Sequence, residues 1–288
     1  MKSHNNMNIS SMRSWMRSRM MRKQTTIEPK DFLWANLTRL PYFRAFLRAV
    51  EGRFYEDIQL LEPVLDVGCG DGIFAEITFD KKISVGFDLA LSSLREPANR
   101  KAYSSILCAA GANIPFPEGY FSTVISNSVL EHIPEIDAVV AEIQRVLKPG
   151  GMFIFCVPND NLLKNLSISN ALDKIGLHRM ADAYRTFFNT ISRHHHADPL
   201  DVWQERLTKN GFQIEKWWHY FSPKNLHTLE WGHYFGLPAL INKKIFGKWI
   251  LFPMHWNIFI PEKDLRKQYD QNPLHPAGSY TFYITRKG

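Results

Sequence analysis

The fold of this chain is decided by residues 64–75, which read VLDVGCGDGIFA. Val64, Leu65 and Val67 suit a strand that is covered on both of its faces. The glycines that follow allow positive φ angles and a close approach of the backbone to a ligand. Because a strand, a glycine turn and a helix meet here, we expect amide groups of the turn to point at a ligand above the sheet. Asp66 lies at the strand's end, where its carboxylate can pair with a cationic amine.

Strands and helices alternate after this turn. We expect strands at 64–67, 83–88, 105–109, 122–126, 152–157 and 212–221, a last edge strand at 279–285, and helices at 31–59, 136–147 and 201–209. The sequence Lys148-Pro149-Gly150-Gly151 stops the second of these helices. This alternation predicts an α/β fold with a doubly wound, mainly parallel sheet.

Charge is distributed unevenly along the chain. Six of the 35 Lys and Arg residues lie in residues 1–27, which contain no Asp or Glu, so the remainder carries 29 basic against 28 acidic residues. A near-neutral body disfavours a nucleic-acid groove, and we expect residues 1–30 to form a basic, disordered tail. Cys69, Cys108 and Cys156 lie in or beside strands that we expect to be buried, without the spacing of a metal site. Their pattern favours a reducing, cytoplasmic setting and unreactive thiols.

A second acid indicates which ligand the turn holds. Asp88 ends the strand after the turn, where a carboxylate can accept hydrogen bonds from both hydroxyls of a ribose. A dinucleotide site has the spacing GxGxxG, whereas the glycines here are Gly68, Gly70 and Gly72. The spacing therefore favours a nucleoside that carries a charged amino-acid tail over a pyrophosphate.

Four segments together carry a family resemblance. They are VLDVGCGDGIFA, VGFDLA, NIPFPEGYFSTVISNSVLEHI and RVLKPGGMFIFCVPN, in this order along the chain. Their combination resembles the class I S-adenosylmethionine-dependent methyltransferases of the small-molecule type. The resemblance covers residues 60–160 and, more loosely, 200–222. It implies the seven-stranded, Rossmann-like methyltransferase sheet, with helical and aromatic insertions, and S-adenosylmethionine as the cofactor.

The resemblance also implies roles for individual residues. Asp66, Gly68 and Gly70 would surround the methionine part of the cofactor, and Cys69 would also bind the cofactor. Asp88 would bind the ribose hydroxyls, Leu89 would lie beside the adenine, and Asn127 would lie near the transferred methyl group. Similar proteins often have an acid where this chain has Ala110, so backbone atoms or Asn113 would recognise the adenine instead. They also often have Asp at the position of Ser122.

Methyl transfer asks the protein to align an attacking atom with an electrophilic sulfonium and to exclude water. His132, six residues after the expected fourth strand, is the candidate general base, and its alternative role is to bond the backbone of a loop. The run His194-His195-His196 followed by Asp198 suggests a metal, but adjacent histidines do not all face one point. We therefore expect no metal here, and a loop from which His195 is a second, weaker catalytic candidate.

These observations predict an enzyme that methylates a small-molecule acceptor, with oxygen favoured over nitrogen or carbon. We expect one domain over 31–288, with a helical cap at 31–59, a cofactor-binding core at 60–160, and insertions at 161–200 and 223–275 as a substrate lid. The aromatic residues of the second half either pack in the core or line that lid. Three alternatives remain: a cofactor-binding partner protein without turnover, an NAD-dependent oxidoreductase, and a methyltransferase whose lipid-linked acceptor lies at a membrane surface near residues 241–252.

Overall fold

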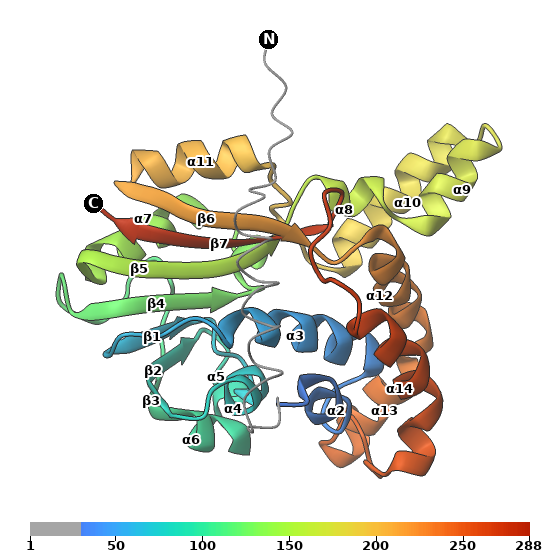
Figure 1. Ribbon diagram of the computed structural model, residues 1–288, viewed down its shortest axis with the longest axis horizontal. Coiled ribbons are helices and arrows are strands. Elements are labelled where there is room, and N and C mark those ends of the chain that lie inside the picture. Colours follow the sequence, from blue (N-terminus) through green and yellow to red (C-terminus); the bar gives the residue numbers. More distant parts are fainter. Residues whose placement is uncertain (1–29) are drawn as a thin grey trace. The chain divides into compact units, whose positions relative to one another are not determined.

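The computed structural model describes residues 30–288, so residues 1–29 of the expected tail lie outside the described residues. One seven-stranded sheet has the order β3-β2-β1-β4-β5-β7-β6 (Figure 1). Its strands are β1 (Val64–Val67), β2 (Ile83–Asp88), β3 (Tyr103–Cys108), β4 (Phe121–Asn127), β5 (Leu147–Pro158), β6 (Phe212–Tyr220) and β7 (Tyr280–Lys287). The first five strands pair in parallel, whereas β7 pairs antiparallel with β5. The expected doubly wound, mainly parallel sheet is confirmed.

The expectation that residues 279–285 form an edge strand is wrong. β7 lies between β5 and β6, and every residue of β7 except Arg286 is buried. The alternation that suggested a half-exposed strand comes from threonines whose hydroxyls are bonded inside the protein. Thr281 Oγ1 accepts from Asn159 Nδ2 at 2.9 Å, and Thr285 Oγ1 donates to the Phe153 carbonyl at 3.0 Å. Because both hydroxyls have partners, their burial costs little.

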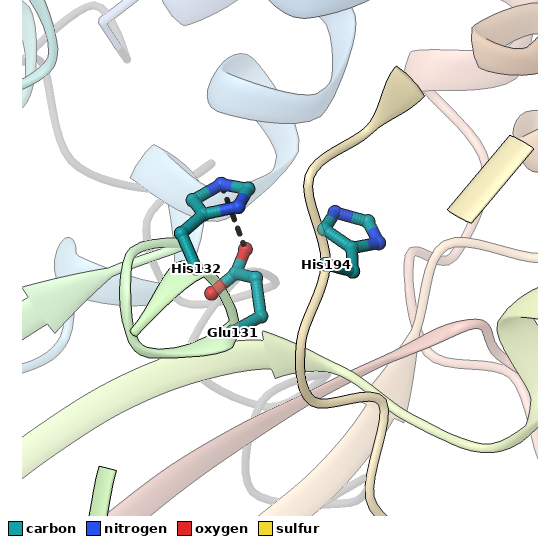
Figure 2. A group of neighbouring side chains, drawn as sticks. All are labelled: Glu131, His132 and His194. Atoms are coloured by element: carbon teal, nitrogen blue, oxygen red, sulfur yellow. Dashed lines mark ion pairs between the residues drawn. The ribbon is translucent and has the colours of Figure 1, made fainter. Parts of the chain in front are cut away.

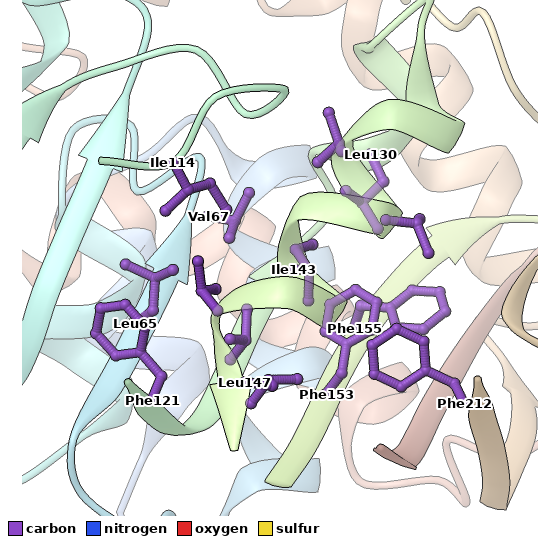
Figure 3. Close-up of a cluster of buried hydrophobic side chains, with 14 of the residues drawn as sticks. Leu65, Val67, Ile114, Phe121, Leu130, Ile143, Leu147, Phe153, Phe155 and Phe212 are labelled. Carbon is purple, nitrogen blue, oxygen red and sulfur yellow. The ribbon is translucent and has the colours of Figure 1, made fainter. Parts of the chain in front are cut away.

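Helices cover the sheet, and two of them build its main core. The helices of this part are α4 (Ile73–Thr78), α5 (Leu91–Leu94), α6 (Pro97–Ala102), the 3-10 turn η1 (Leu130–His132), α7 (Ile136–Val146), α8 (Asn161–Lys164), α9 (Ser167–Lys174), α10 (His178–Ile191) and α11 (Leu200–Lys209). Ile143 of α7 packs with Phe153 and Phe155 of β5 in one buried cluster (Figure 3). Trp203 of α11 belongs to the same cluster. The expected amphipathic helix at 136–147 is thereby confirmed, since its apolar side faces this cluster.

The chain divides into two compact units. The sheet lies in the unit formed by residues 59–217 and 279–288, although β6 ends three residues beyond it. The other unit contains residues up to Ile58 together with residues 218–278. The expected core 60–160 thus belongs to one unit, and nearly all of the cap 31–59 belongs with the insertion 223–275 to the other. The role of the insertions as a lid stays a prediction.

The second unit is helical. Its helices are α2 (Phe32–Leu37), α3 (Tyr42–Tyr55), α12 (Pro223–Phe235), α13 (Leu237–Phe246) and α14 (His255–Tyr269). The expected single helix over 31–59 is wrong because Pro41 separates α2 from α3, and the residue before a proline avoids the helical conformation. Phe43 of α3 packs on Gly232 of α12, where a Cβ would lie 2.2 Å from the Phe43 Cβ. In the described part of the chain, no helix has the length and apolar character needed to cross a membrane.

Candidate functional site

The glycine turn after β1 uses its three glycines differently. Gly68, Gly70 and Gly72 all have positive φ angles, of 78°, 54° and 74°. A Cβ on Gly68 would lie 2.2 Å from Val129 Cγ1, and one on Gly72 would lie 2.7 Å from the Asn99 backbone nitrogen. A Cβ on Gly70 would meet nothing within 4 Å. The outer two glycines are therefore required by packing, and the middle one borders open space.

The turn does not present its amide groups as we expected. The amides of Gly68 and Cys69 both donate to the Phe87 carbonyl at 2.9 Å. The Gly70 amide donates to Asp88 Oδ2 at 3.0 Å. These donors are used to hold the end of β1 to the end of β2. A phosphate bound here would have to compete with those bonds, which agrees with the glycine spacing in disfavouring a pyrophosphate.

Asp88 is anchored at the carboxyl end of β2. Its Oδ2 accepts from Gly70 as described, and its Oδ1 accepts from the Ala90 amide at 2.8 Å. A carboxylate oxygen can accept two hydrogen bonds, so each oxygen retains the capacity to accept a ligand hydroxyl. Leu89 follows with 74% of its surface exposed, and Cys108 Sγ lies 3.5 Å from its carbonyl oxygen. A fixed carboxylate beside an exposed apolar side chain suits a sugar and the base attached to it.

Asp66 has a partner that sequence reasoning missed. The Tyr103 hydroxyl donates to Asp66 Oδ2 at 2.5 Å. Burial raises the pKa of Tyr103 well above its usual value, so the hydroxyl keeps its proton and remains a donor. Gly86 of β2 makes room for this ring, because a Cβ there would lie 2.8 Å from Tyr103 Cδ1. A glycine in the middle of a buried strand was the available signal.

Asn99, which was also missed, holds the glycine turn from the side of α6. Its side chain is fully buried, and its Nδ2 donates to the carbonyls of Gly70 at 3.0 Å and Ser93 at 2.9 Å. Its backbone also packs directly on Gly72, as described above. Asn99 thus fixes the turn between Asp66 and Asp88.

We expect Asn99→Ala to lower the free energy of unfolding by about 1–3 kcal/mol, because two carbonyl oxygens lose their donor. The measurement is urea unfolding at equilibrium. Asn113→Ala is the matched control, since Asn113 is exposed, and it should stay within about 0.5 kcal/mol of the unmodified chain. Equal stability of the two variants would contradict the role given to Asn99.

The carboxyl end of β4 lies against the same turn. Asn127 is buried, and its Oδ1 accepts from Cys156 Sγ at 3.1 Å. Ser128 follows with a φ of 52°, a left-handed conformation that is uncommon for serine and is concentrated at functional sites. Ser122 lies at the other end of β4, where its hydroxyl donates to the Glu62 carbonyl. The departure from the family pattern at Ser122 therefore does not touch the site.

The cysteines are not nucleophiles of this site. Cys69 is buried, and both its burial and the carboxylates of Asp66 and Asp88 raise the pKa of its thiol. Cys156 is buried, as expected. The expectation for Cys108 is wrong: it ends β3 at the surface and is exposed.

His132 lies on η1, directly after β4, and the structure brings His194 rather than His195 beside it. The rings of His132 and His194 are 5.3 Å apart between centroids, with Glu131 next to them (Figure 2). The side chain of His195 is exposed, and its backbone amide donates to the Glu131 carbonyl at 2.7 Å. His196 is turned to the Pro134 carbonyl, 3.1 Å from its Nε2. The catalytic roles expected for His132 and His195 stay predictions.

Comparisons of the sequence with known proteins agree with this geometry. Residues 65–155 match the family model of a methyltransferase domain. An uncharacterized protein of Methanocaldococcus jannaschii is 31% identical over 147 residues, which are 48% of this chain and 60% of that protein. A ubiquinone biosynthesis O-methyltransferase of Chromobacterium violaceum is 36% identical over 109 residues, 35% of this chain and 46% of that enzyme. The chain thus matches less than two thirds of the length of either relative.

Solved structures support the fold. An S-adenosylmethionine-dependent methyltransferase of Thermotoga maritima superposes with a TM-score of 0.52 at 12% identity, covering 85% of this chain and 92% of that one. At that identity the likeness concerns the fold alone. The matched segment begins in β1 and ends in β5, so it contains the glycine turn, Asp88 and the end of β4. Over residues 65–155 the chain therefore contains a methyltransferase domain.

Proposed function

We propose that this chain transfers the methyl group of S-adenosylmethionine to an oxygen atom of a small-molecule acceptor. The observation that carries the proposal is the alignment of three polar side chains, Asp66, Asp88 and Asn127, at the carboxyl ends of β1, β2 and β4. This edge is where ligands bind in doubly wound sheets. The choice of oxygen is supported by the ubiquinone biosynthesis O-methyltransferase among the relatives.

Each of these side chains has a role in the proposal. Asp66, oriented by Tyr103, pairs with the ammonium group of the methionine part. Asp88 accepts the ribose hydroxyls, and the exposed Leu89 packs on the adenine. Asn127 lies nearest the methyl group. S-Adenosylmethionine carries both charge signs and no phosphate, which fits a turn whose amides already bond to β2.

His132 is the group that we expect to activate the acceptor hydroxyl. Its Nδ1 lies 3.0 Å from the Arg193 carbonyl oxygen. A carbonyl can only accept, so Nδ1 carries the hydrogen, and Nε2 presents its lone pair in the neutral ring. An oxygen nucleophile needs its proton removed, and a positioned group of this kind contributes about 100- to 10,000-fold to the rate.

Thermal unfolding with candidate cofactors tests the proposal. At about 100 times its dissociation constant, S-adenosylmethionine or its demethylated product should stabilise the chain by about 2.7 kcal/mol, and NADH should not. Stabilisation by NADH alone would contradict the proposal and support an oxidoreductase instead. A cell extract supplied with methyl-labelled cofactor should then give an O-methylated product, with aqueous and lipid fractions analysed separately. Label in the lipid fraction would identify a lipid-linked acceptor, and binding without any transfer would support a non-catalytic partner protein.

A further inference from the structure

Three side chains beside the expected methyl position form a set of metal ligands. Glu131 and His132 come from η1, and His194 comes from the loop after α10 (Figure 2). One ligand atom from each lies within 4.8 Å of the other two, and Glu131 Oε1 is 3.9 Å from His132 Nε2. We propose that Glu131, His132 and His194 bind a divalent transition-metal ion, and that the acceptor hydroxyl is activated on this ion.

The orientation of the His132 ring is the first argument. With its Nδ1 hydrogen directed to the Arg193 carbonyl, the neutral ring turns the Nε2 lone pair toward the Glu131 carboxylate. A cation, either a second ring proton or a metal ion, can bind between two acceptors placed in this way. Histidines that bind metals almost always donate their other ring N–H to a carbonyl or carboxylate in this way.

The backbone around the cluster is fixed before any ion binds. The amides of His195 and His196 both donate to the Glu131 carbonyl, at 2.7 and 3.2 Å. Arg193 has a φ of 56°, a left-handed conformation that turns the chain so that His194 faces η1. The two segments are therefore joined by main-chain bonds after His194 and by the bond from the His132 ring to the Arg193 carbonyl before it. A site held on rigid partners in this way loses little entropy when it binds an ion.

The donor set indicates the kind of ion. Two imidazole nitrogens and one carboxylate oxygen suit zinc, manganese, iron or cobalt better than calcium or magnesium, which prefer oxygen ligands. Ligand atoms that each lie about 2.1 Å from such an ion are roughly 3–4 Å apart, so the atoms of this cluster, which lie within 4.8 Å of one another, need to approach by at most about 1–2 Å. Three protein ligands leave coordination positions open, as in catalytic sites. The His132 side chain is 43% exposed, so these positions can be reached from outside.

This inference rests on the proposed function, assigns the activation of the acceptor hydroxyl to the ion that His132 holds in place of His132 itself, and adds the class of acceptor. Glu131 follows Asn127 by four residues, so an acceptor oxygen on the ion would lie on the methyl side of the site. Binding to the ion releases the hydroxyl proton to solvent. A lone pair of the acceptor oxygen then forms the bond to the methyl carbon as the carbon–sulfur bond breaks. The electrons of the broken bond stay on sulfur, which gives S-adenosylhomocysteine. Acceptors with two neighbouring oxygens, which can chelate the ion, are favoured.

Titration of the tag-free, metal-stripped full chain with Co2+ tests the site by visible absorption. We expect one equivalent to bind with bands of cobalt held by nitrogen ligands. Glu131→Gln, His132→Ala and His194→Ala should each weaken this binding at least about 10-fold. His195→Ala is the matched control in the same loop and should bind as the unmodified chain does. Absence of stoichiometric binding, or equal loss in the His195 variant, would overturn the proposal and leave a proton as the cation.

A second measurement separates this inference from the proposed function. Methyl transfer from S-adenosylmethionine should be abolished by a chelator and restored by added Mn2+, Co2+ or Zn2+. Transfer that is unchanged by the chelator would overturn the metal site while the methyltransferase assignment stands. Stoichiometric Co2+ binding that depends on His194, in a chain that S-adenosylmethionine does not stabilise, would support the metal site and contradict the proposed function.

Discussion

Gly68→Ala should destabilise the protein by about 2–5 kcal/mol and abolish cofactor binding. Two costs add at this position. The φ of 78° costs an alanine about 1–2 kcal/mol, and the new Cβ would lie 2.2 Å from Val129 Cγ1, which forces the turns after β1 and β4 apart. The total stability of a domain is about 5–15 kcal/mol, so a loss of this size is readily seen in urea unfolding.

Gly70→Ala should lose less stability than Gly68→Ala but should still bind the cofactor weakly. Its Cβ meets nothing within 4 Å, so only the left-handed conformation costs stability, about 1–2 kcal/mol. The added methyl group, however, occupies the open space beside Asp88, where we expect the ribose. The variant should therefore fold and yet bind S-adenosylmethionine at least about 10-fold more weakly, measured by calorimetry.

Gly119→Ala is the control for both variants. Gly119 has a φ of 65° with nothing within 4 Å of its added Cβ, and it lies before β4, at the end of the strand remote from the site. It should lose the same 1–2 kcal/mol as Gly70→Ala and keep its affinity for the cofactor. If Gly70→Ala binds the cofactor as tightly as the unmodified chain does, the cofactor does not occupy the space beside this turn.

The parallel part of the fold was predictable because its signals are local. The turn between 64 and 75 and the apolar strands around it specify β1, β2 and β5 by composition alone. β7 was misplaced at an edge because its threonines look exposed in the sequence. Their hydroxyls bond to Asn159 and to the Phe153 carbonyl, partners that are more than 100 residues away along the chain. No pattern of neighbouring residues contains that information.

The site was predictable where a side chain lies at or next to the carboxyl end of a strand, as Asp66, Asp88 and Asn127 do. Residues that act on these groups from other elements were missed. Tyr103 reaches Asp66 across β2, and it can do so only because Gly86 has no side chain. Adjacent histidines argued against a metal as long as all three were counted together. The cluster needs only one histidine of the triplet, His194, which lies beside His132 although 62 residues separate the two in the sequence.

Asp88→Ala should weaken binding of S-adenosylhomocysteine by at least about 100-fold. Two charge-assisted hydrogen bonds to the ribose hydroxyls are lost, each of which contributes about 1.5–3 kcal/mol. Since 1.4 kcal/mol corresponds to a tenfold change in affinity, the loss of both bonds lies well within the range of calorimetry.

Asp88 also holds the glycine turn, so loss of affinity alone would not identify its role. The carboxylate accepts from the amides of Gly70 and Ala90, and the alanine variant leaves both donors to water. The 2′,3′-dideoxy analogue of S-adenosylhomocysteine separates the two effects, because it lacks the hydroxyls and keeps every other group. Against this analogue, Asp88→Ala should lose less than about 10-fold, and the unmodified chain should bind it as weakly as the variant binds the natural ligand. An equal loss against both ligands would show that Asp88 acts through the turn and that the ribose is bound elsewhere.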